Sequence, residues 1–348
     1  MKYLALVILF FACNVHADSE SNSRAIDHAP IGVSADHYHK KGESMISVKH
    51  GYMKMGETIF NGDSISFDDV LAMPNPLNTT PMNLSVIPTD MSMQMSMVGG
   101  MYAPTNSVTL MAMGMFVSKK MDLNTYQAMM NRNLLGKFST SSSDLSNISI
   151  GALIKLKETE TTRLHAEITL QYSIGDQDTR GVALTPMGEN MKMTLPYGMQ
   201  SGDGSTRLVL GLTQVKKLNE KMRWGNQARI KTAISKADWA FGDHTELNSW
   251  LQYEVNQAVS LSSRLKWTHQ GKISGRDQTI SAPVQTANPE NYGGKEWHIG
   301  FGINLLTHII PGNKDRLSLE ILQPIKQQKN NLQMKTDYLV IFGYQKTF

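Results

Sequence analysis

Methionine has the most distinctive spacing in this chain of 348 residues, of which 23 are methionine. In the stretch MSMQMSMVGGMYAPTNSVTLMAMGMF (91–116) it takes every second position of two runs: Met91, Met93, Met95 and Met97, then Met111, Met113 and Met115. Thioether sulfur is a soft ligand that selects ions such as Cu(I), and it is also an adaptable hydrophobe. The spacing therefore indicates either a soft-metal site or the apolar face of a hairpin.

Histidine and aspartate gather in IDHAPIGVSADHYHKKGE (26–43). A His-x-His pair on an extended segment places both rings on one side, and imidazole with carboxylate can bind a divalent metal. Asp36, His37 and His39 are therefore candidate metal ligands, with Asp27 and His28 close to them in sequence. The alternative, which we expect, is a solvated periplasmic segment before the first strand.

The chain lacks the patterns that catalysis needs. No Ser-His-Asp grouping, His-Glu-x-x-His or glycine-rich phosphate loop is present in the sequence. The His-x-Ser-Asn-Gly pattern of the outer-membrane phospholipases is also missing, and the nearest stretch, around His269, lacks the serine. We expect no catalytic residue, no enzymatic activity and no cofactor.

The first residues read as a secretory signal. Lys2 precedes a short apolar run at 3–12, and Val15-His16-Ala17 is a small-residue cleavage site, so we expect residues 1–17 to be removed. The alternative is a lipid attached to Cys13, which is the only cysteine. A mature chain cut after residue 17 has no disulfide and no thiolate ligand.

Apolar residues recur at every second position along much of the chain, and this period predicts the strands that carry the candidate residues. In RLHAEITLQYSI (163–174) every even position is apolar and every odd position is polar. A helix would need spacings of three and four, so the pattern predicts a strand with one apolar and one polar face. No stretch after residue 17 approaches the roughly 20 apolar residues of a membrane helix.

The links between strands alternate in length. The alternation of apolar and polar residues predicts strands at 45–55, 91–103, 108–117, 146–157, 163–174, 206–216, 222–234, 245–256, 260–270, 296–306, 315–323 and 334–348. The long polar links are 56–90, 118–145, 175–205 and 271–295, and the short ones are 103–107, 158–162, 217–221 and 256–259. Outer-membrane barrels have short periplasmic turns and long external loops. We therefore predict an all-β, antiparallel outer-membrane β-barrel of about twelve strands at 44–348, preceded by a periplasmic segment at 18–43.

The chain ends in TDYLVIFGYQKTF. One face of this last strand carries Tyr338, Val340, Phe342, Tyr344 and Phe348. It resembles the C-terminal strand of bacterial outer-membrane proteins, and the resemblance implies recognition by the barrel-assembly machinery and a place in outer-membrane lipid. The alternative is the edge strand of a soluble sandwich.

Charged side chains on the polar faces belong in the lumen, because a charge facing lipid costs roughly 2–4 kcal/mol at mid-depth. The predicted lumen residues are Arg163, Glu167, Arg207, Arg223, Arg229, Lys231, Glu246, Glu254, Arg264, Lys266, Glu296, Arg316 and Glu320. Two interpretations stay open: opposite charges that pair across a filled barrel, or a basic wall that favours anionic or polar solutes.

The same reasoning orients the methionines. The residues between the first run are Ser92, Gln94 and Ser96, which suit water, so the first run is expected to face lipid. The residues between the second run are apolar or small, which turns Met111, Met113 and Met115 inward, near Met53 and Met55. An inward thioether cluster could bind Cu(I) or form a track for an apolar solute.

The stretches APIGVSADHYHKKGESMISVKHGYMKM (29–55) and MSMQMSMVGGMYAPTNSVTLMAM (91–113) are similar to a family of proteobacterial outer-membrane proteins called simply "transporter". That family is distantly similar to channels associated with meta-cleavage degradation of phenol. The resemblance implies a channel or facilitator for a small solute, and the basic lumen face favours a polar or anionic one. The alternatives are a structural or plugged barrel acting through its loops, soft-metal handling, or uptake of a hydrophobic compound. The net charge of +4 indicates no nucleic-acid partner.

Overall fold

The computed structural model describes residues 24–77, 80–129, 131–310 and 315–348. The predicted signal peptide (1–17) and Cys13 within it lie outside the described residues. The strands of the main sheet are β1 (Ser44–Phe60), β2 (Asp63–Ser64), β3 (Val86–Tyr102), β4 (Val108–Tyr126), β5 (Leu134–Glu158), β6 (Thr162–Ser173), β9 (Thr206–Asn219), β10 (Met222–Ser235), β12 (His244–Asn256), β13 (Val259–Gln270), β15 (Gly294–Thr307), β16 (Asp315–Lys329) and β17 (Leu332–Thr347). The remaining elements are η1 (Ala25–Asp27), α1 (Phe67–Ala72), β7 (Arg180–Leu184), β8 (Asn190–Thr194), η2 (Tyr197–Met199), β11 (Trp239–Ala240), β14 (Ser274–Gly275) and η3 (Gln285–Ala287).

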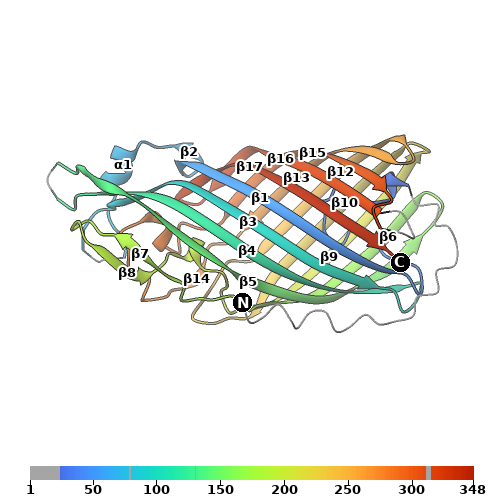
Figure 1. Cartoon of the computed structure of the whole chain (residues 1–348), viewed down its shortest axis with the longest axis horizontal. Helices are drawn as coiled ribbons and strands as arrows, with labels where there is room; N and C mark the ends of the chain where they lie inside the picture. The colour runs from blue at the N-terminus through green and yellow to red at the C-terminus, as the bar shows by residue number, and fades with distance from the viewer. Residues whose placement is uncertain (1–23, 78–79, 130, 311–314) are drawn as a thin grey trace.

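Twelve antiparallel strands close into a barrel. Consecutive long strands pair around the ring from β1 through β3, β4 and onward to β17, and β17 pairs back with β1 (Figure 1). The closing register runs from Met45 opposite Thr347 to Phe60 opposite Leu332. Only β2 extends the sheet beyond the ring. Each of the twelve ring strands is paired on both sides, which a strand structure in lipid requires, and the predicted all-β barrel is confirmed.

The two faces of the ring differ as the period of two predicts. On β6, Ile168, Leu170 and Tyr172 are exposed on the outside, whereas Glu167 and Thr169, at the alternate positions, are buried. Other strands also expose Val, Leu, Ile and Phe on the outer face. A continuous exposed apolar surface of this kind is typical of a protein that meets lipid. Among the described residues, no helix is long and apolar enough to cross a membrane.

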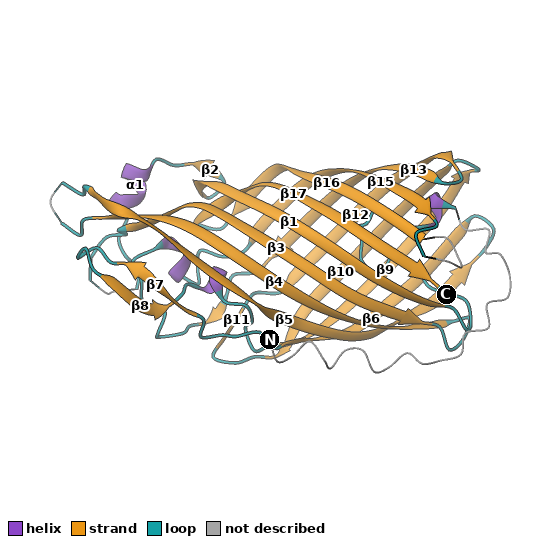
Figure 2. Cartoon of the chain, viewed as in Figure 1, coloured by secondary structure: helices purple, strands orange, loops and turns teal. Residues whose placement is uncertain are grey.

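The ends of the ring differ in their connections. The C-terminus and the tight links, such as 103–107 and 159–161, lie at one end, here called the turn end. The opposite loop end carries α1, β7, β8 and β14 (Figure 1). Figure 2 shows strands along the length of the ring, with helix confined to short segments near its two ends.

The predicted loop at 118–145 is wrong. β4 continues to Tyr126, paired with β3 on one side and β5 on the other, and β5 starts at Leu134, so these residues extend the strands of this part of the ring. The outer face of that extension is polar, with Ser139 and Ser141 exposed. Outside the lipid a strand needs no apolar outer face, so the alternation that identified the other strands is missing there.

Loops at the loop end fold together into an apolar cluster, here called the loop cluster. Its members include Leu77, Met91, Met121, Leu195, Tyr197, Met199, Trp239, Ile280, Val284 and Met334. The Tyr197 and Trp239 rings meet edge-to-face with centroids 4.8 Å apart. The Lys119 ammonium on β4 donates hydrogen bonds to the carbonyls of Gly198 and Gln200, at 3.0 and 2.6 Å. These contacts tie the loops to the inner wall of the barrel.

Candidate functional site

The N-terminal segment (residues 24–43) runs inside the barrel at the turn end. Inward side chains of several strands hold its backbone: Gln252 donates to the His28 carbonyl, Arg316 to Ala29, Lys49 to Ile31, Gln227 to Ser34 and His165 to Ala35, while Glu320 accepts from the Gly32 N–H. The expected solvated segment is therefore wrong for this stretch, in which only residues 40–42 are exposed and the others are buried or partly buried. Its local sequence is that of a polar linker. The prediction failed because the partners of its backbone lie on strands that come together only when the ring closes.

A cavity of about 290 Å³ lies in the barrel interior against the N-terminal segment, and it is our candidate site. Ser34, Ala35, Asp36 and His37 of that segment line it on one side. Its apolar wall, here called the methionine wall, consists of Met45, Met97, Met101, Met111, Met113 and Met115 from β1, β3 and β4. Strands β10 and β12, across the ring, contribute charged side chains.

The prediction that Met91, Met93, Met95 and Met97 face lipid is wrong. Val98 and Tyr102 on the same strand are exposed on the outside, whereas Met97 and Met101 line the cavity and Met91 is buried in the loop cluster. The odd positions of β3 therefore face inward throughout. The first run lies toward the loop end, where the outer face meets water and takes Ser92, Gln94 and Ser96, while the interior is packed with apolar side chains.

Pairs of methionines lie directly opposite one another on neighbouring strands. Met97 pairs with Met115, and Met101 pairs with both Met111 and Met45. Side chains in such register have Cβ atoms about 4.5–5.5 Å apart. The methionine wall is thus a continuous surface of thioethers rather than a set of separate side chains.

The charged side of the cavity is largely neutralised by ion pairs. The Arg229 Nε and Nη2 donate to the two carboxylate oxygens of Glu167 at 2.7 and 2.9 Å. The Lys266 Nζ lies 2.9 Å from a carboxylate oxygen of Glu246. Lys231 lines the same cavity, and no carboxylate of the described residues comes within 4.0 Å of its ammonium. Lys231 therefore faces the cavity without a carboxylate partner among the described residues, as does Lys49 on β1.

All thirteen predicted lumen residues lie on the inner face of their strands. Further pairs join Arg264 with Glu320 at 2.8 Å and Arg207 with Asp203 at 2.5 Å, and Arg24 of the N-terminal segment pairs with Glu254. Arg223 donates to the Asn219 carbonyl, Arg163 to the Asp27 carbonyl, and Glu296 lies 3.5 Å from Lys329 and from His298. Pairing across the interior, one of the two interpretations open from sequence, describes most of these charges.

Several functional residues were missed by sequence reasoning. Gln227, Gln252 and His165 hold the N-terminal segment, and Lys49 lines the cavity while donating to the Ile31 carbonyl at 2.9 Å. Their inward position follows from strand parity, which the sequence does show. Their partner leaves no trace in the local pattern, because it lies 130 or more residues away along the chain from Gln227, Gln252 and His165.

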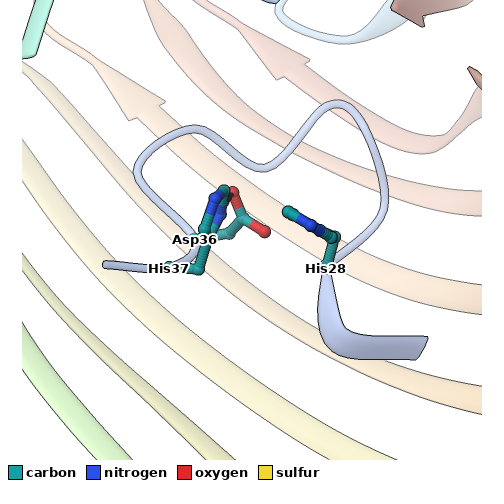
Figure 3. Close-up of side chains that lie close together, drawn as sticks. All are labelled: His28, Asp36 and His37. Carbon is teal, nitrogen blue, oxygen red and sulfur yellow. Dashed lines mark hydrogen bonds and ion pairs between the residues drawn. The ribbon is translucent and has the colours of Figure 1, made fainter. Parts of the chain in front are cut away.

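The predicted metal ligands separate into two places. Asp36 and His37 come together with His28, not with the methionines, and one ligand atom of each lies within 4.8 Å of the others (Figure 3). The His39 ring is next to His37, with centroids 4.9 Å apart. Met111, Met113 and Met115 form a separate group, although Asp36 and His37 line the same cavity as these methionines.

No protein-family model and no curated protein sequence matches this chain. Among solved structures, an outer membrane channel from Pseudomonas putida F1 has 14% sequence identity and a TM-score of 0.56, with 91% of this chain and 100% of that one covered. This chain has the fold of an outer-membrane channel. The TodX monoaromatic hydrocarbon channel, as a deltaS2 mutant, has 12% identity and a TM-score of 0.49 over 89% of this chain and 91% of its own. The NanC porin has 6% identity and a TM-score of 0.42 over 86% and 98%.

Proposed function

We propose that this protein is an outer-membrane channel for a small solute that has an apolar body and a polar or anionic group. The observation that carries the proposal is the internal cavity, which has the methionine wall on one side and Lys231 with the Arg229–Glu167 pair on the other. A binding site of mixed character within a membrane-type barrel suits a solute that must be recognised and released during passage.

The outer surface and the last strand support a location in the outer membrane. The exposed apolar outer face fits lipid, and Tyr338, Phe342 and Phe348 are exposed along the last strand. We propose that a signal at residues 1–17 directs export, that the barrel-assembly machinery reads this strand, and that the turn end faces the periplasm. Under this topology the loop at 173–206 and the 126–134 hairpin tip face outside.

The anionic preference rests on Lys231 and Lys49. Both ammonium groups line the cavity, and neither has a carboxylate of the described chain within 4.0 Å. A positive field beside low-dielectric walls concentrates anions and repels cations. Arg229 contributes less to this field, because Glu167 binds it at both nitrogens.

Passage requires the N-terminal segment to move. The segment lies within the turn end of the ring, and the loop cluster fills part of the loop end. We propose that the described state is a closed one in which the cavity lies on the path, and that displacement of residues 24–39 opens the periplasmic side.

Planar-bilayer recording of the purified mature protein tests the proposal. We expect anion-preferring conductance steps, together with the heat-modifiable gel migration of a folded barrel. A folded barrel that stays silent would overturn the channel and favour a structural barrel acting through its loops. Recovery of the protein in soluble periplasmic extract would overturn the location. Normal assembly after deletion of Phe348 would overturn the assembly signal.

A second candidate function is soft-metal handling. It is favoured by the opposed thioethers of Met97 with Met115 and of Met101 with Met111, because two or three sulfur ligands suit Cu(I). The first candidate needs only the apolar shape of these side chains, whereas the second needs their sulfur. Substitution by leucine separates the two.

A further inference from the structure

The N-terminal segment contains a group of imidazoles that the channel proposal does not use. The His28 and His37 rings meet edge-to-face with centroids 4.3 Å apart, and the His37 and His39 rings do so at 4.9 Å (Figure 3 shows His28, His37 and Asp36). His37 and His39 are more than nine-tenths buried. Aliphatic side chains would pack at least as well in this position, so packing alone does not explain three imidazoles.

One ring nitrogen of each histidine lacks a hydrogen-bond partner. His28 Nδ1, His37 Nε2 and His39 Nε2 are buried, and each has no hydrogen-bond partner among the described residues. Leaving a buried polar atom unpaired costs about 1–3 kcal/mol. Two of these atoms belong to residues that, with Asp36, place one ligand atom each within 4.8 Å of the others. A bound cation would satisfy the nitrogens that the protein leaves open.

Asp36 is arranged as a metal site needs. One of its oxygens lies 2.9 Å from His37 Nδ1, and the other accepts a hydrogen bond from the Ala29 N–H at 2.9 Å. A carboxylate on one imidazole nitrogen fixes the ring and leaves the opposite nitrogen, His37 Nε2, as the ligand. The Asp36 charge also offsets the Arg316 guanidinium, which donates to the Ala29 carbonyl at 3.2 Å.

We propose that His28 and His37 bind one divalent transition-metal ion of the zinc or copper(II) type, with Asp36 orienting the His37 ring, and that the ion clips the loop at 28–37 closed. Imidazole nitrogen suits these borderline ions better than Ca²⁺ or Mg²⁺, which take oxygen ligands. The ligands stand at the two ends of one loop (Figure 3), so the ion stabilises the N-terminal segment in its inserted form. This inference does not depend on the channel proposal.

The test uses tag-free mature protein, folded in detergent, stripped with a chelator and titrated with Zn²⁺ by calorimetry. We expect one ion per chain, and electron paramagnetic resonance with Cu²⁺ should show coupling to two imidazole nitrogens. His28→Ala and His37→Ala should each weaken binding roughly 100-fold or more, since residues that only orient a ligand are already worth about 10–100-fold. His269→Ala, which removes an exposed histidine on β13, should leave binding unchanged.

Hydrogen exchange of peptides covering 28–39 measures the clip itself. Zn²⁺ should slow their exchange in the wild-type protein and have no effect in His37→Ala. Heat-modifiable migration verifies that each variant still forms the barrel, whose strands start only at Ser44. A folded wild-type protein that binds no Zn²⁺ or Cu²⁺, or that binds equally after loss of both His28 and His37, would overturn the site. Binding that leaves exchange unchanged would overturn the clip.

Discussion

Arg229 on β10 and Glu167 on β6 form a two-point ion pair across the intervening strand β9. The residue between them in register is Gly211, which pairs with Arg229 on one side and Glu167 on the other. A Cβ atom at Gly211 would lie 2.8 Å from a Glu167 carboxylate oxygen, so a side chain there would block the pair. The glycine lets two strands that are not neighbours share one salt bridge.

Glu167→Gln should destabilise the barrel and change its selectivity. Hydrogen bonds to charged groups contribute about 1.5–3 kcal/mol each, so the free energy of unfolding in urea should fall by about that amount. The released Arg229 charge should raise the anion preference of the conductance. In Arg229→Gln/Glu167→Gln the selectivity should return toward the wild-type value. Equal stability of the single variant and the wild type would contradict the pair's structural role.

Lys231→Gln should lower the anion preference. The variant removes a cavity-lining ammonium that has no carboxylate nearby, and the loss of such a field reduces the local anion concentration by about tenfold or more. The matched control is Lys120→Gln, because the Lys120 side chain is 60% exposed at the loop end and makes no part of the cavity. Reversal-potential measurements in a salt gradient give the ratio. A similar drop in both variants would show a general surface-charge effect instead.

Replacing Met111, Met113 and Met115 together by leucine separates hydrophobic from sulfur chemistry. Volume-conserving changes of this kind usually cost below about 1.5 kcal/mol each, so the barrel should fold. If the wall serves an apolar solute body, flux should be retained, whereas Cu(I) binding should disappear if sulfur is the ligand. Competition with a Cu(I) chelator and solute uptake into liposomes are the two measurements. Unchanged Cu(I) binding would remove the soft-metal candidate.

Deletion of residues 24–39 should increase the single-channel conductance. The deletion removes the segment held by Gln227, Gln252 and Arg316 and leaves β1, which starts at Ser44. The milder variant Gln227→Ala/Gln252→Ala removes two side chains that hold the segment and should increase the frequency of opening. Conductance that is unchanged by both would place the barrier at the loop cluster instead.

The period of two determined the barrel from sequence. The strand at 163–174 separates apolar from polar residues so completely that only one orientation avoids charges in lipid, and the same holds for β10, β12 and β16. Where charged residues occupied one face, the inner and outer sides could therefore be assigned residue by residue. The physical reason is local, since the cost of a charge in lipid depends on its own position alone.

The tertiary structure decided the direction of Met91 and Met97, because serine and glutamine carry no charge and tolerate either side. Whether their outer face meets lipid or water depends on how far β3 extends beyond the apolar surface, which is a property of the assembled ring. The position of His28 beside Asp36 and His37 was decided in the same way. The N-terminal segment acquires a fixed conformation only when strands more than a hundred residues away, bearing Gln227, Gln252 and Arg316, close around it and satisfy its backbone.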